Sequence, residues 1–325
     1  MICYGSELTA LQVQGNQLVT ATGTPLILRG INALDPLIQV KNPDAGAGPW
    51  TEAYYAAMAA WGSNVVRLPI HPTSWRDTIP LSSLTILDQS ITWAKIHKMY
   101  VIIDYHSIGL IHLDTYEKTD WHDYRTTKKE VIEFWKTIAA QYKDNPVVAA
   151  YEIFNEPVNL KTPTNMQDWL LWKSDAEEII TAIRAIDTHK IIIVGGLQWA
   201  YDLSPVANAP IADSNIVYAV HPYPGSNYNH SWDIAFGTLS EKYPLIATEV
   251  GFRLGEGSAA YYLNTYQPQK KESYTDALLP YLKKHNISWT AWNFSKYWDP
   301  PLLQDETDFT PNTAGRYFKN GLKDY

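Results

Sequence analysis

Eight short runs rich in β-branched residues recur along the chain, and segments with helical periodicity separate them. Each run has the length of a buried strand, and the eight are Leu26–Ile31, Asn64–Leu68, Tyr100–Asp104, Val147–Ile153, Lys190–Val194, Asn215–Val220, Leu245–Thr248 and Ser288–Trp292. The clearest helical segments are Thr51–Trp61, Leu84–His97, Thr127–Tyr142, Met166–Ile186 and Tyr274–Lys284. Because alternating strands and helices form parallel sheets with crossover helices, this pattern predicts a (β/α)8 TIM barrel.

Two segments depart from the simple alternation. The crossover from Gln198 to Asp213 has little helical periodicity and contains two prolines, so we expect a shortened or broken helix there. Near the start, Gly15 and Asn16 separate two short alternating segments, which predicts a β-hairpin within residues 1–20. We expect this hairpin to cover the bottom of the barrel. No linker interrupts the alternation, so residues 1–325 are expected to form a single domain.

Composition excludes several classes of protein. Hydrophobic residues make up 46% of the chain and charged residues 18%, as in ordinary globular proteins. No apolar run approaches the roughly 18 residues that span a bilayer, so no membrane partner is expected. The net charge is −8 and no basic run exceeds two lysines, which argues against a nucleic-acid surface. A neutral polymer is a better match for this surface.

Aromatic and cysteine usage narrow the choice further. The chain has 13 Trp and 22 Tyr against 7 Phe, a balance that favours flat rings able to stack on sugar faces, although a Trp-rich core would look similar. Its single cysteine, Cys3, excludes an intramolecular disulfide and a cysteine-based zinc site. The sequence opens Met1-Ile2-Cys3-Tyr4, and no secretory signal is visible in it.

Two glutamates stand where predicted strands end. Glu156 lies in Tyr-Glu-Ile-Phe-Asn-Glu-Pro and Glu249 in Leu-Ile-Ala-Thr-Glu-Val-Gly. Glycosidic bond cleavage needs two acids, since one must protonate the leaving oxygen while the other acts at the opposite face of the sugar carbon. At about 5 Å and an effective dielectric near 20, their repulsion is roughly 3 kcal/mol, enough to keep one protonated near neutral pH. The alternative is two ordinary acids that cap helices or pair with arginine.

Other predicted strands also deliver polar or aromatic side chains at their carboxyl ends, where the chemistry of such barrels collects. These residues are Arg67, Asp104, His106, Asn155, His221, Tyr223 and Trp292. Each has a structural alternative: Arg67 could neutralise buried acids, the histidines could be satisfied core residues, and Trp292 could be core. Their joint placement at strand ends favours a functional site.

The chain resembles glycoside hydrolase family 5, the large family of cellulases and mannanases, along nearly its whole length. Eight residues carry the resemblance in order and spacing: Arg67, His106, Asn155, Glu156, His221, Tyr223, Glu249 and Trp292. It implies a retaining mechanism in which Glu156 is the acid/base and Glu249 the nucleophile. Asn155 would donate to the sugar 2-hydroxyl, and Tyr223 and Arg67 would hold the pKa of Glu249 low.

The resemblance implies roles for the remaining residues too. His106 and His221 would orient hydroxyl groups or Glu156, and Trp292 would form the floor beneath the cleaved sugar. Outside this set, Trp199 and Tyr201 could stack on leaving-group sugars, and Lys296 could bind sugar hydroxyls. By loop position, further candidates are Trp50, Trp121, Trp232 and Trp298.

We predict no cofactor and no catalytic metal. Residues 106–123 contain several His and Asp, but no ligand spacing such as His-Glu-x-x-His occurs. Retaining hydrolysis by two carboxylates needs no metal, and these residues fit a long loop that lines a cleft. The sequence leaves open whether the protein binds a structural calcium ion.

The sequence therefore predicts a retaining endo-β-1,4-glucanase acting on cellulose or mixed-linkage β-glucan. Within the same class, a β-mannanase and a xyloglucanase are alternatives. A non-catalytic carbohydrate-binding barrel and a metal-dependent barrel hydrolase are alternatives of other classes. We expect the partner to be a β-glucan polysaccharide, the enzyme to be a monomer, and its location, inferred from this function, to be extracellular.

Overall fold

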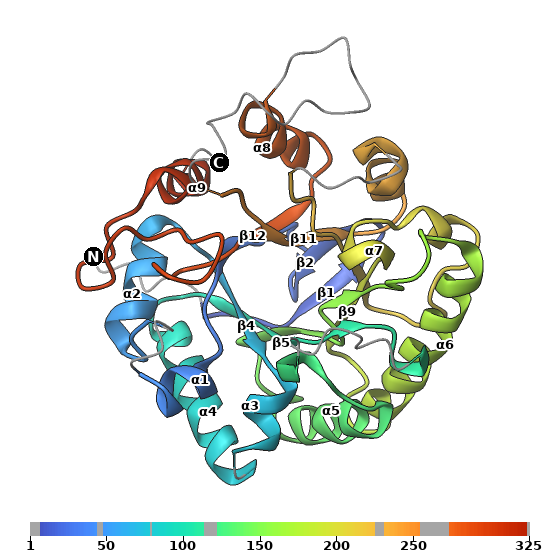
Figure 1. Cartoon of the computed structure of the whole chain (residues 1–325), viewed down its shortest axis with the longest axis horizontal. Helices are drawn as coiled ribbons and strands as arrows, with labels where there is room; N and C mark the ends of the chain where they lie inside the picture. Colours follow the sequence, from blue (N-terminus) through green and yellow to red (C-terminus); the bar gives the residue numbers. More distant parts are fainter. Residues whose placement is uncertain are drawn as a thin grey trace.

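A closed eight-stranded parallel barrel forms the centre of the protein (Figure 1). The computed structural model describes residues 7–43, 48–78, 80–113, 122–224, 231–253 and 273–323. In chain order the barrel strands are β3 (Arg29–Asn32), β4 (Val65–Ile70), β5 (Tyr100–Tyr105), β7 (Val148–Glu152), β9 (Ile191–Gly195), β10 (Ile216–Ala219), β11 (Leu245–Val250) and β12 (Ser288–Ala291). β12 pairs with β3 and closes the ring, so the predicted barrel and all eight predicted strands are confirmed.

A ring of helices surrounds the barrel in Figure 1. The five predicted helices are present as α2 (Glu52–Trp61), α4 (Pro80–Ile96), α5 (Lys128–Tyr142), α6 (Met166–Arg184) and α8 (Tyr274–Lys284). Local sequence fixes some of their starts. At α5, Thr127 and Glu130 form a reciprocal capping box, which satisfies two backbone donors of the first turn. None of the helices in the described part of the chain is long and apolar enough to cross a membrane.

Three further helices lie outside the predicted segments: α1 (Pro36–Lys41), α3 (Pro72–Arg76) and α9 (Thr313–Lys323). The first two are short and begin at prolines, which suit the first position of a helix. In α9, Ala314, Phe318 and Leu322 are buried at intervals of four residues. The segment is therefore clearly amphipathic, and the feature of its sequence that argues against a helix is its two glycines, Gly315 and Gly321, which lower helix propensity.

The crossover after β9 is broken, as predicted. It contains only the four-residue α7 (Leu197–Ala200) and a 3-10 turn, η3 (Ser204–Ala207). Gln198, Trp199 and Ala200 have φ values of 59°, 56° and 55°, so α7 is a left-handed turn rather than an α-helix. Non-glycine residues rarely adopt this conformation, and it turns the chain back so that Leu197 and Asp202 exchange backbone hydrogen bonds.

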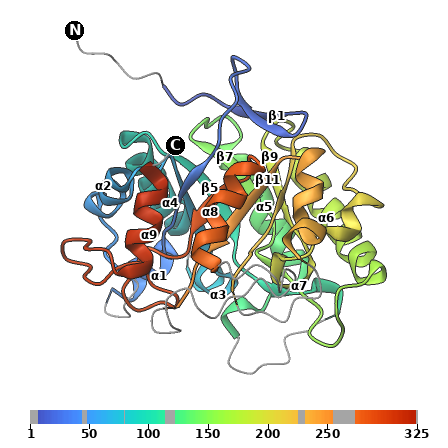
Figure 2. The same ribbon diagram turned by 90° about the horizontal axis from the view of Figure 1, so that it is seen from above.

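The predicted hairpin is confirmed and covers one end of the barrel (Figure 2). It consists of β1 (Leu11–Gln14) and β2 (Gln17–Thr20), and Gly15 at its turn has a φ of 62°. Leu11 and Leu18 pack in one cluster with the first residues of three barrel strands, Val65, Tyr100 and Ile191. The hairpin therefore lies at the N-terminal end of the strands, which leaves the C-terminal end for a site.

Candidate active site

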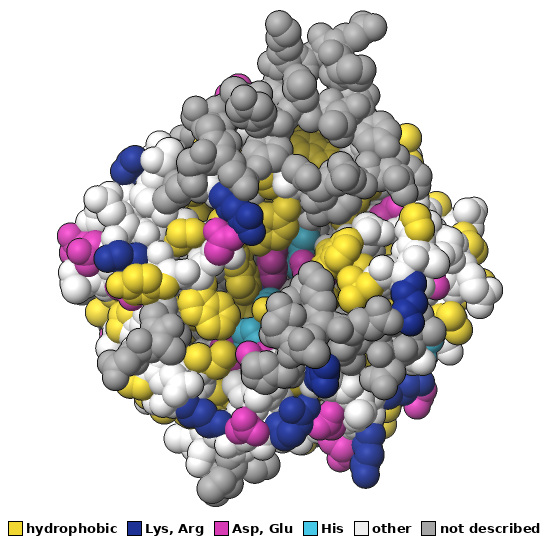
Figure 3. All heavy atoms as spheres, in the orientation of Figure 1, with side chains coloured by type: hydrophobic (Ala, Val, Ile, Leu, Met, Phe, Trp, Pro, Cys, Tyr) yellow, Lys and Arg dark blue, Asp and Glu magenta, His cyan; other side chains and the backbone are white. Residues whose placement is uncertain are grey.

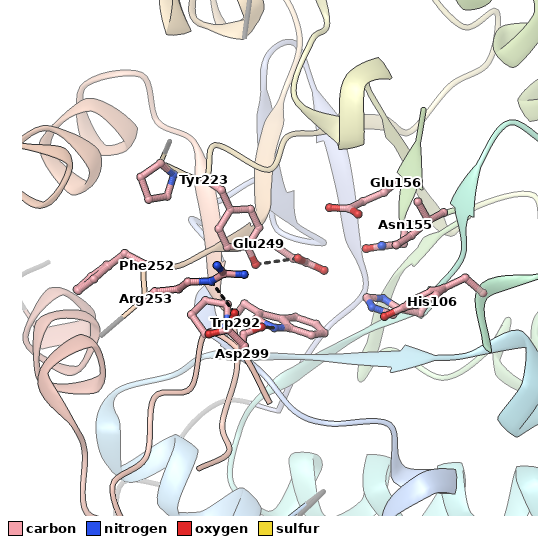
Figure 4. A pocket seen from close by; sticks show the side chains of 13 residues that line it. His106, Asn155, Glu156, Tyr223, Glu249, Phe252, Arg253, Trp292 and Asp299 are labelled. Carbon is pink, nitrogen blue, oxygen red and sulfur yellow. Dashed lines mark hydrogen bonds and ion pairs between the residues drawn. The ribbon is translucent and has the colours of Figure 1, made fainter. Parts of the chain in front are cut away.

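A cavity of about 480 Å³ opens at the C-terminal end of the barrel. Figure 3 shows acidic and histidine side chains at the bottom of this hollow. Six of the predicted site residues line it together: His106, Asn155, Glu156, Tyr223, Glu249 and Trp292 (Figure 4). They come from five strand ends, as the sequence pattern indicated. Arg67 and His221 are fully buried beside these residues and contact them directly.

The two glutamates have different surroundings. One carboxylate oxygen of Glu156 and one of Glu249 lie within 4.8 Å of each other. Glu249 accepts hydrogen bonds from Arg67 Nη1 and from the hydroxyl of Tyr223, each at 2.9 Å. Glu156 Oε1 instead lies 2.9 Å from Nδ1 of His221. A charged donor and a hydroxyl donor favour the ionised form of Glu249, whereas Glu156 has no ion pair with Arg67.

Arg67 organises the floor of the site from a fully buried position. Its Nε donates to Glu152 Oε2 at 2.6 Å, its Nη1 to Asn32 Oδ1 at 2.9 Å, and its Nη2 lies 3.0 Å from Asp104 Oδ2. Nη2 also donates to Asn155 Oδ1 at 2.8 Å. Because guanidinium only donates, this contact fixes the amide orientation of Asn155, and its NH₂ group is left to donate elsewhere in the cavity that it lines.

Burial controls the ionisation of both glutamates. It raises the pKa of Glu156 to about 7, and repulsion from Glu152 adds to the rise while Arg67 opposes it. Burial also raises the pKa of Glu249, against the lowering effects of His221, Arg67 and Tyr223. The expectation that Arg67 and Tyr223 hold the pKa of Glu249 low is therefore wrong in its net result. The two residues act in the predicted direction, but desolvation outweighs them.

His106 and Trp292 form one wall of the cavity. Nδ1 of His106 lies 2.6 Å from Asp104 Oδ2, and its ring stacks on Trp292 with centroids 5.2 Å apart and planes 5° apart. Burial lowers the pKa of His106 well below its usual value, so its imidazole is neutral. The indole of Trp292 donates to the backbone oxygen of Asp299 at 3.2 Å, which fixes the ring on its other side.

The remaining candidates lie apart from the two glutamates. Trp199 and Tyr201 line a second cavity of about 290 Å³, between the loops that follow β7 and β9. Lys296 is exposed, and its Nζ lies 5.3 Å from the ring centroid of Tyr297. It lines neither of these two cavities.

The loop tryptophans have varied surroundings. Trp50 packs against Trp93, and its indole donates to Ser90. The ring of Trp232 contacts that of Tyr281, and the ring centroids of Trp298 and His71 are 5.8 Å apart. Trp121 lies outside the described residues.

The sequence did not single out several residues of the site. Tyr124, Phe252, Arg253 and Asp299 also line the main cavity, and Arg253 Nε lies 2.6 Å from Asp299 Oδ2 at its rim. Tyr124 ends a three-residue 3-10 turn and the other three lie in segments between strands and helices, where periodicity gives no signal. Glu152 had a usable signal, since it is the one charged residue in the apolar run from Val147 to Ile153.

One group of described residues has ligand atoms close enough for a metal ion: Glu156, His221 and Glu249, within 4.8 Å of one another. Other contacts already use these atoms. Both ring nitrogens of His221 have partners at 2.9 and 3.0 Å, and Arg67 supplies the positive charge beside Glu249. A cation would have to displace these partners, so we identify none of the three as a metal ligand, and metal independence stays a prediction.

A parallel barrel with two carboxylates this close at its C-terminal end, above a buried arginine, is a glycoside hydrolase of the two-carboxylate type. The chain belongs to glycosyl hydrolase family 5, since the family model described as "Cellulase (glycosyl hydrolase family 5)" matches residues 19–297. The family resemblance is thereby confirmed.

Similar curated proteins are named endoglucanases. Endoglucanase A of Butyrivibrio fibrisolvens is 29% identical over 291 residues, which cover 88% of this chain and 60% of that protein. An endoglucanase of Clostridium saccharobutylicum is 29% identical over 298 residues, 87% of this chain and 56% of the relative. The chain thus spans somewhat more than half the length of these curated relatives.

A solved structure covers the whole length. The β-glucanase SdGluc5_26A from Saccharophagus degradans is 33% identical, covers 99% of this chain and 97% of its own, and has a TM-score of 0.83. The same β-glucanase has also been solved in complex with cellotetraose.

Proposed function

We propose that this protein is a retaining endo-β-1,4-glucanase that hydrolyses cellulose or mixed-linkage β-glucan by double displacement. The observation that carries the proposal is the pair Glu156 and Glu249, whose oxygens lie within 4.8 Å. Retaining enzymes hold the two carboxyl groups about 5 to 5.5 Å apart, whereas inverting enzymes need roughly 6.5 to 9.5 Å to admit a water. The endoglucanase relatives and the cellotetraose complex of the β-glucanase support the substrate class.

In the first step Glu249 attacks the anomeric carbon while Glu156 gives its proton to the glycosidic oxygen. The bond between sugar and leaving group breaks, and an ester forms between the sugar and Glu249. In the second step a water attacks the same carbon, Glu156 takes a proton from it, and the ester bond breaks. Each glutamate then has its starting ionisation again. The raised pKa of Glu156, about 7, suits a group that must give a proton and later take one back.

The neighbouring side chains support these roles. Arg67 and Tyr223 donate to Glu249 and stabilise the carboxylate before attack. Asn155 has its NH₂ group available for the sugar 2-hydroxyl, a contact that strengthens in the transition state. Trp292 provides an apolar face for the sugar at the cleavage point, and His106 offers a neutral imidazole to its hydroxyls. His221 orients Glu156.

Outside the main cavity, we propose that Trp199 and Tyr201 bind leaving-group sugars through the second cavity. Lys296 is the less supported contact, since it lines neither cavity. We further propose that residues 1–325 act as one catalytic domain, as a monomer, without a cofactor or catalytic metal. A polymeric β-glucan is reached outside the cell, so we propose an extracellular location with no nucleic-acid or membrane partner.

The test is reducing-sugar release from carboxymethylcellulose, barley β-glucan, unbranched mannan, glucomannan, xyloglucan and xylan. The matched control is Glu249→Gln, which keeps the shape of the side chain and removes the nucleophile. We expect β-glucan to give the highest kcat/KM, with internal cleavage and β-configured first products. Faster turnover of mannan or xyloglucan would favour the alternative activities. Equal rates for the wild type and the control on every substrate would favour a non-catalytic sugar-binding barrel.

A further inference from the structure

A chain of hydrogen bonds leads from Arg67 to Glu156 through the barrel interior. Arg67 Nε donates to Glu152 Oε2 at 2.6 Å, and the hydroxyl of Thr248 lies 2.7 Å from Glu152 Oε1. The same hydroxyl lies 3.0 Å from Nε2 of His221, whose Nδ1 lies 2.9 Å from Glu156 Oε1. Glu152, Thr248 and His221 are completely buried. This series of hydrogen bonds is therefore shielded from solvent until it reaches Glu156 at the cavity.

The direction of each hydrogen bond follows from the first one. Arg67 and Glu152 form an ion pair with both side chains at 0% exposure, so Glu152 is a carboxylate that only accepts. The Thr248 hydroxyl has a single hydrogen, which it donates in its hydrogen bond to the Glu152 carboxylate. Its oxygen can then only accept from His221, which places a proton on Nε2 of the imidazole.

The tautomer of His221 determines what Glu156 must do. Burial lowers the pKa of His221, so the imidazole is neutral and carries one proton. With that proton on Nε2, Nδ1 presents a lone pair to Glu156 Oε1. A carboxylate there would face the lone pair at 2.9 Å, while a protonated Glu156 donates to it. Other charged or titratable groups near this pair are Arg67, Asp104, His106, Glu152, Glu249, Tyr124 and Tyr223.

We propose that Thr248 and Glu152 are positioning residues that act through His221, fixing its Nε2-protonated tautomer and so holding Glu156 in its protonated form. The inference rests on the proposed role of Glu156 as acid/base and deepens it. Before the first step the hydrogen-bond chain supplies the proton donor that leaving-group departure needs. After that step, ionised Glu156 faces the bare Nδ1, which increases its basicity towards the attacking water.

The kinetic test compares Thr248→Val, which removes the hydroxyl at nearly constant volume, with Thr248→Ser, which keeps it. The alkaline limb of kcat/KM on cellotetraose reports the ionisation of Glu156 in the free enzyme. In the valine variant His221 loses its acceptor at Nε2, so its proton can move to Nδ1 and donate to ionised Glu156. We expect the alkaline limb to move to lower pH by about one unit in the valine variant and to stay in place in the serine variant. The acid limb, set by Glu249, should not move.

A second measurement needs no activity. Nitrogen-15 NMR of labelled histidine in the wild type, with His221 assigned from a His221→Asn variant, should find the proton on Nε2. A proton on Nδ1 in the wild type would overturn the proposal, as would an alkaline limb that stays in place or moves to higher pH in folded Thr248→Val. The upward shift would mean that Thr248 donates to His221. Since the NMR result does not depend on hydrolysis, it separates failure of this inference from failure of the glucanase proposal.

Discussion

Esterification of Glu249 should lower the pKa of Glu156 by about two units. The structure sets the starting point, because burial raises the pKa of Glu156 to about 7 in the free enzyme. It also sets the separation, since oxygens of the two carboxyl groups lie within 4.8 Å. Two unit charges at that distance repel by about 3.5 kcal/mol at an effective dielectric of ~20. At about 1.4 kcal/mol per pKa unit, this repulsion corresponds to roughly 2.5 units, an upper value for the fall.

The direction of this change in the pKa of Glu156 determines whether the residue can serve as both acid and base. When Glu249 becomes an ester its negative charge disappears, so ionisation of Glu156 becomes easier and its pKa falls below its value in the free enzyme. At a pH between these two pKa values, Glu156 is mainly protonated in the free enzyme and mainly ionised in the glycosyl-enzyme. The same side chain can therefore act as acid in the first step and as base in the second at one pH.

The assay is a carbon-13 NMR titration of labelled glutamate carboxyl groups, before and after trapping with a 2-deoxy-2-fluoro cellobioside. The Glu156 signal is identified by its absence in Glu156→Gln. Glu249→Gln is the matched control, because it removes the charge without adding a sugar and should produce a similar fall. If the pKa of Glu156 stays constant or rises in both the trapped enzyme and the Glu249 variant, the two-carboxylate cycle proposed here is refuted.

Three further predictions follow from the same residues. Glu249→Gln should lower kcat on the order of 10⁴-fold while the far-UV circular dichroism stays unchanged, and peptide mapping of the trapped wild type should find the label on Glu249 and on no other residue. Glu156→Gln should be more stable than the wild type by up to about 3 kcal/mol at pH 8 and equally stable at pH 4. The pKa of Glu156 is about 7 in the folded protein against an ordinary 4.5, so ionising Glu156 destabilises the folded state as pH rises through that range. Urea unfolding at both pH values measures the difference in stability. Equal stabilities of the variant and the wild type at pH 8 would contradict the prediction. Dialysis against EDTA should leave kcat on β-glucan unchanged, and a loss restored only by a divalent cation would contradict metal independence.

The barrel could be predicted from the sequence because its strands are buried on both faces. Parallel strands in that environment are continuous apolar runs, and eight such runs separated by amphipathic segments leave few other topologies. The order of polar residues at the strand ends then predicted which side chains meet, and Glu156, Glu249 and Arg67 do lie together. Long helices such as α5 and α6 were visible for a similar reason, since their buried faces follow a regular period.

Loop geometry and burial account for what the sequence did not predict. Arg253 and Asp299 meet at the rim of the cavity although 46 positions separate them, and no periodic pattern links two loop residues. The position of Trp199 depends on the left-handed backbone of Gln198, Trp199 and Ala200. None of the three is a glycine, so nothing in the sequence indicated this conformation. The ionisation of Glu249 was misjudged because its partners can be guessed from spacing, whereas its desolvation depends on the completed barrel.

Strand register brings the buried residues around Arg67 together in one hydrogen-bond network. Parallel pairing sets Asn32 beside Arg67 and Asp104 beside Glu152, so residues from four strands converge at one level of the barrel. Thr248 joins this level from β11, directly before Glu249 in the chain. Thr248 reaches Glu156 through His221, and Glu249 joins the same network through Arg67 and Glu152. This arrangement predicts that Thr248 and Glu249 variants are strongly non-additive in kcat, as expected for side chains that share one hydrogen-bond network.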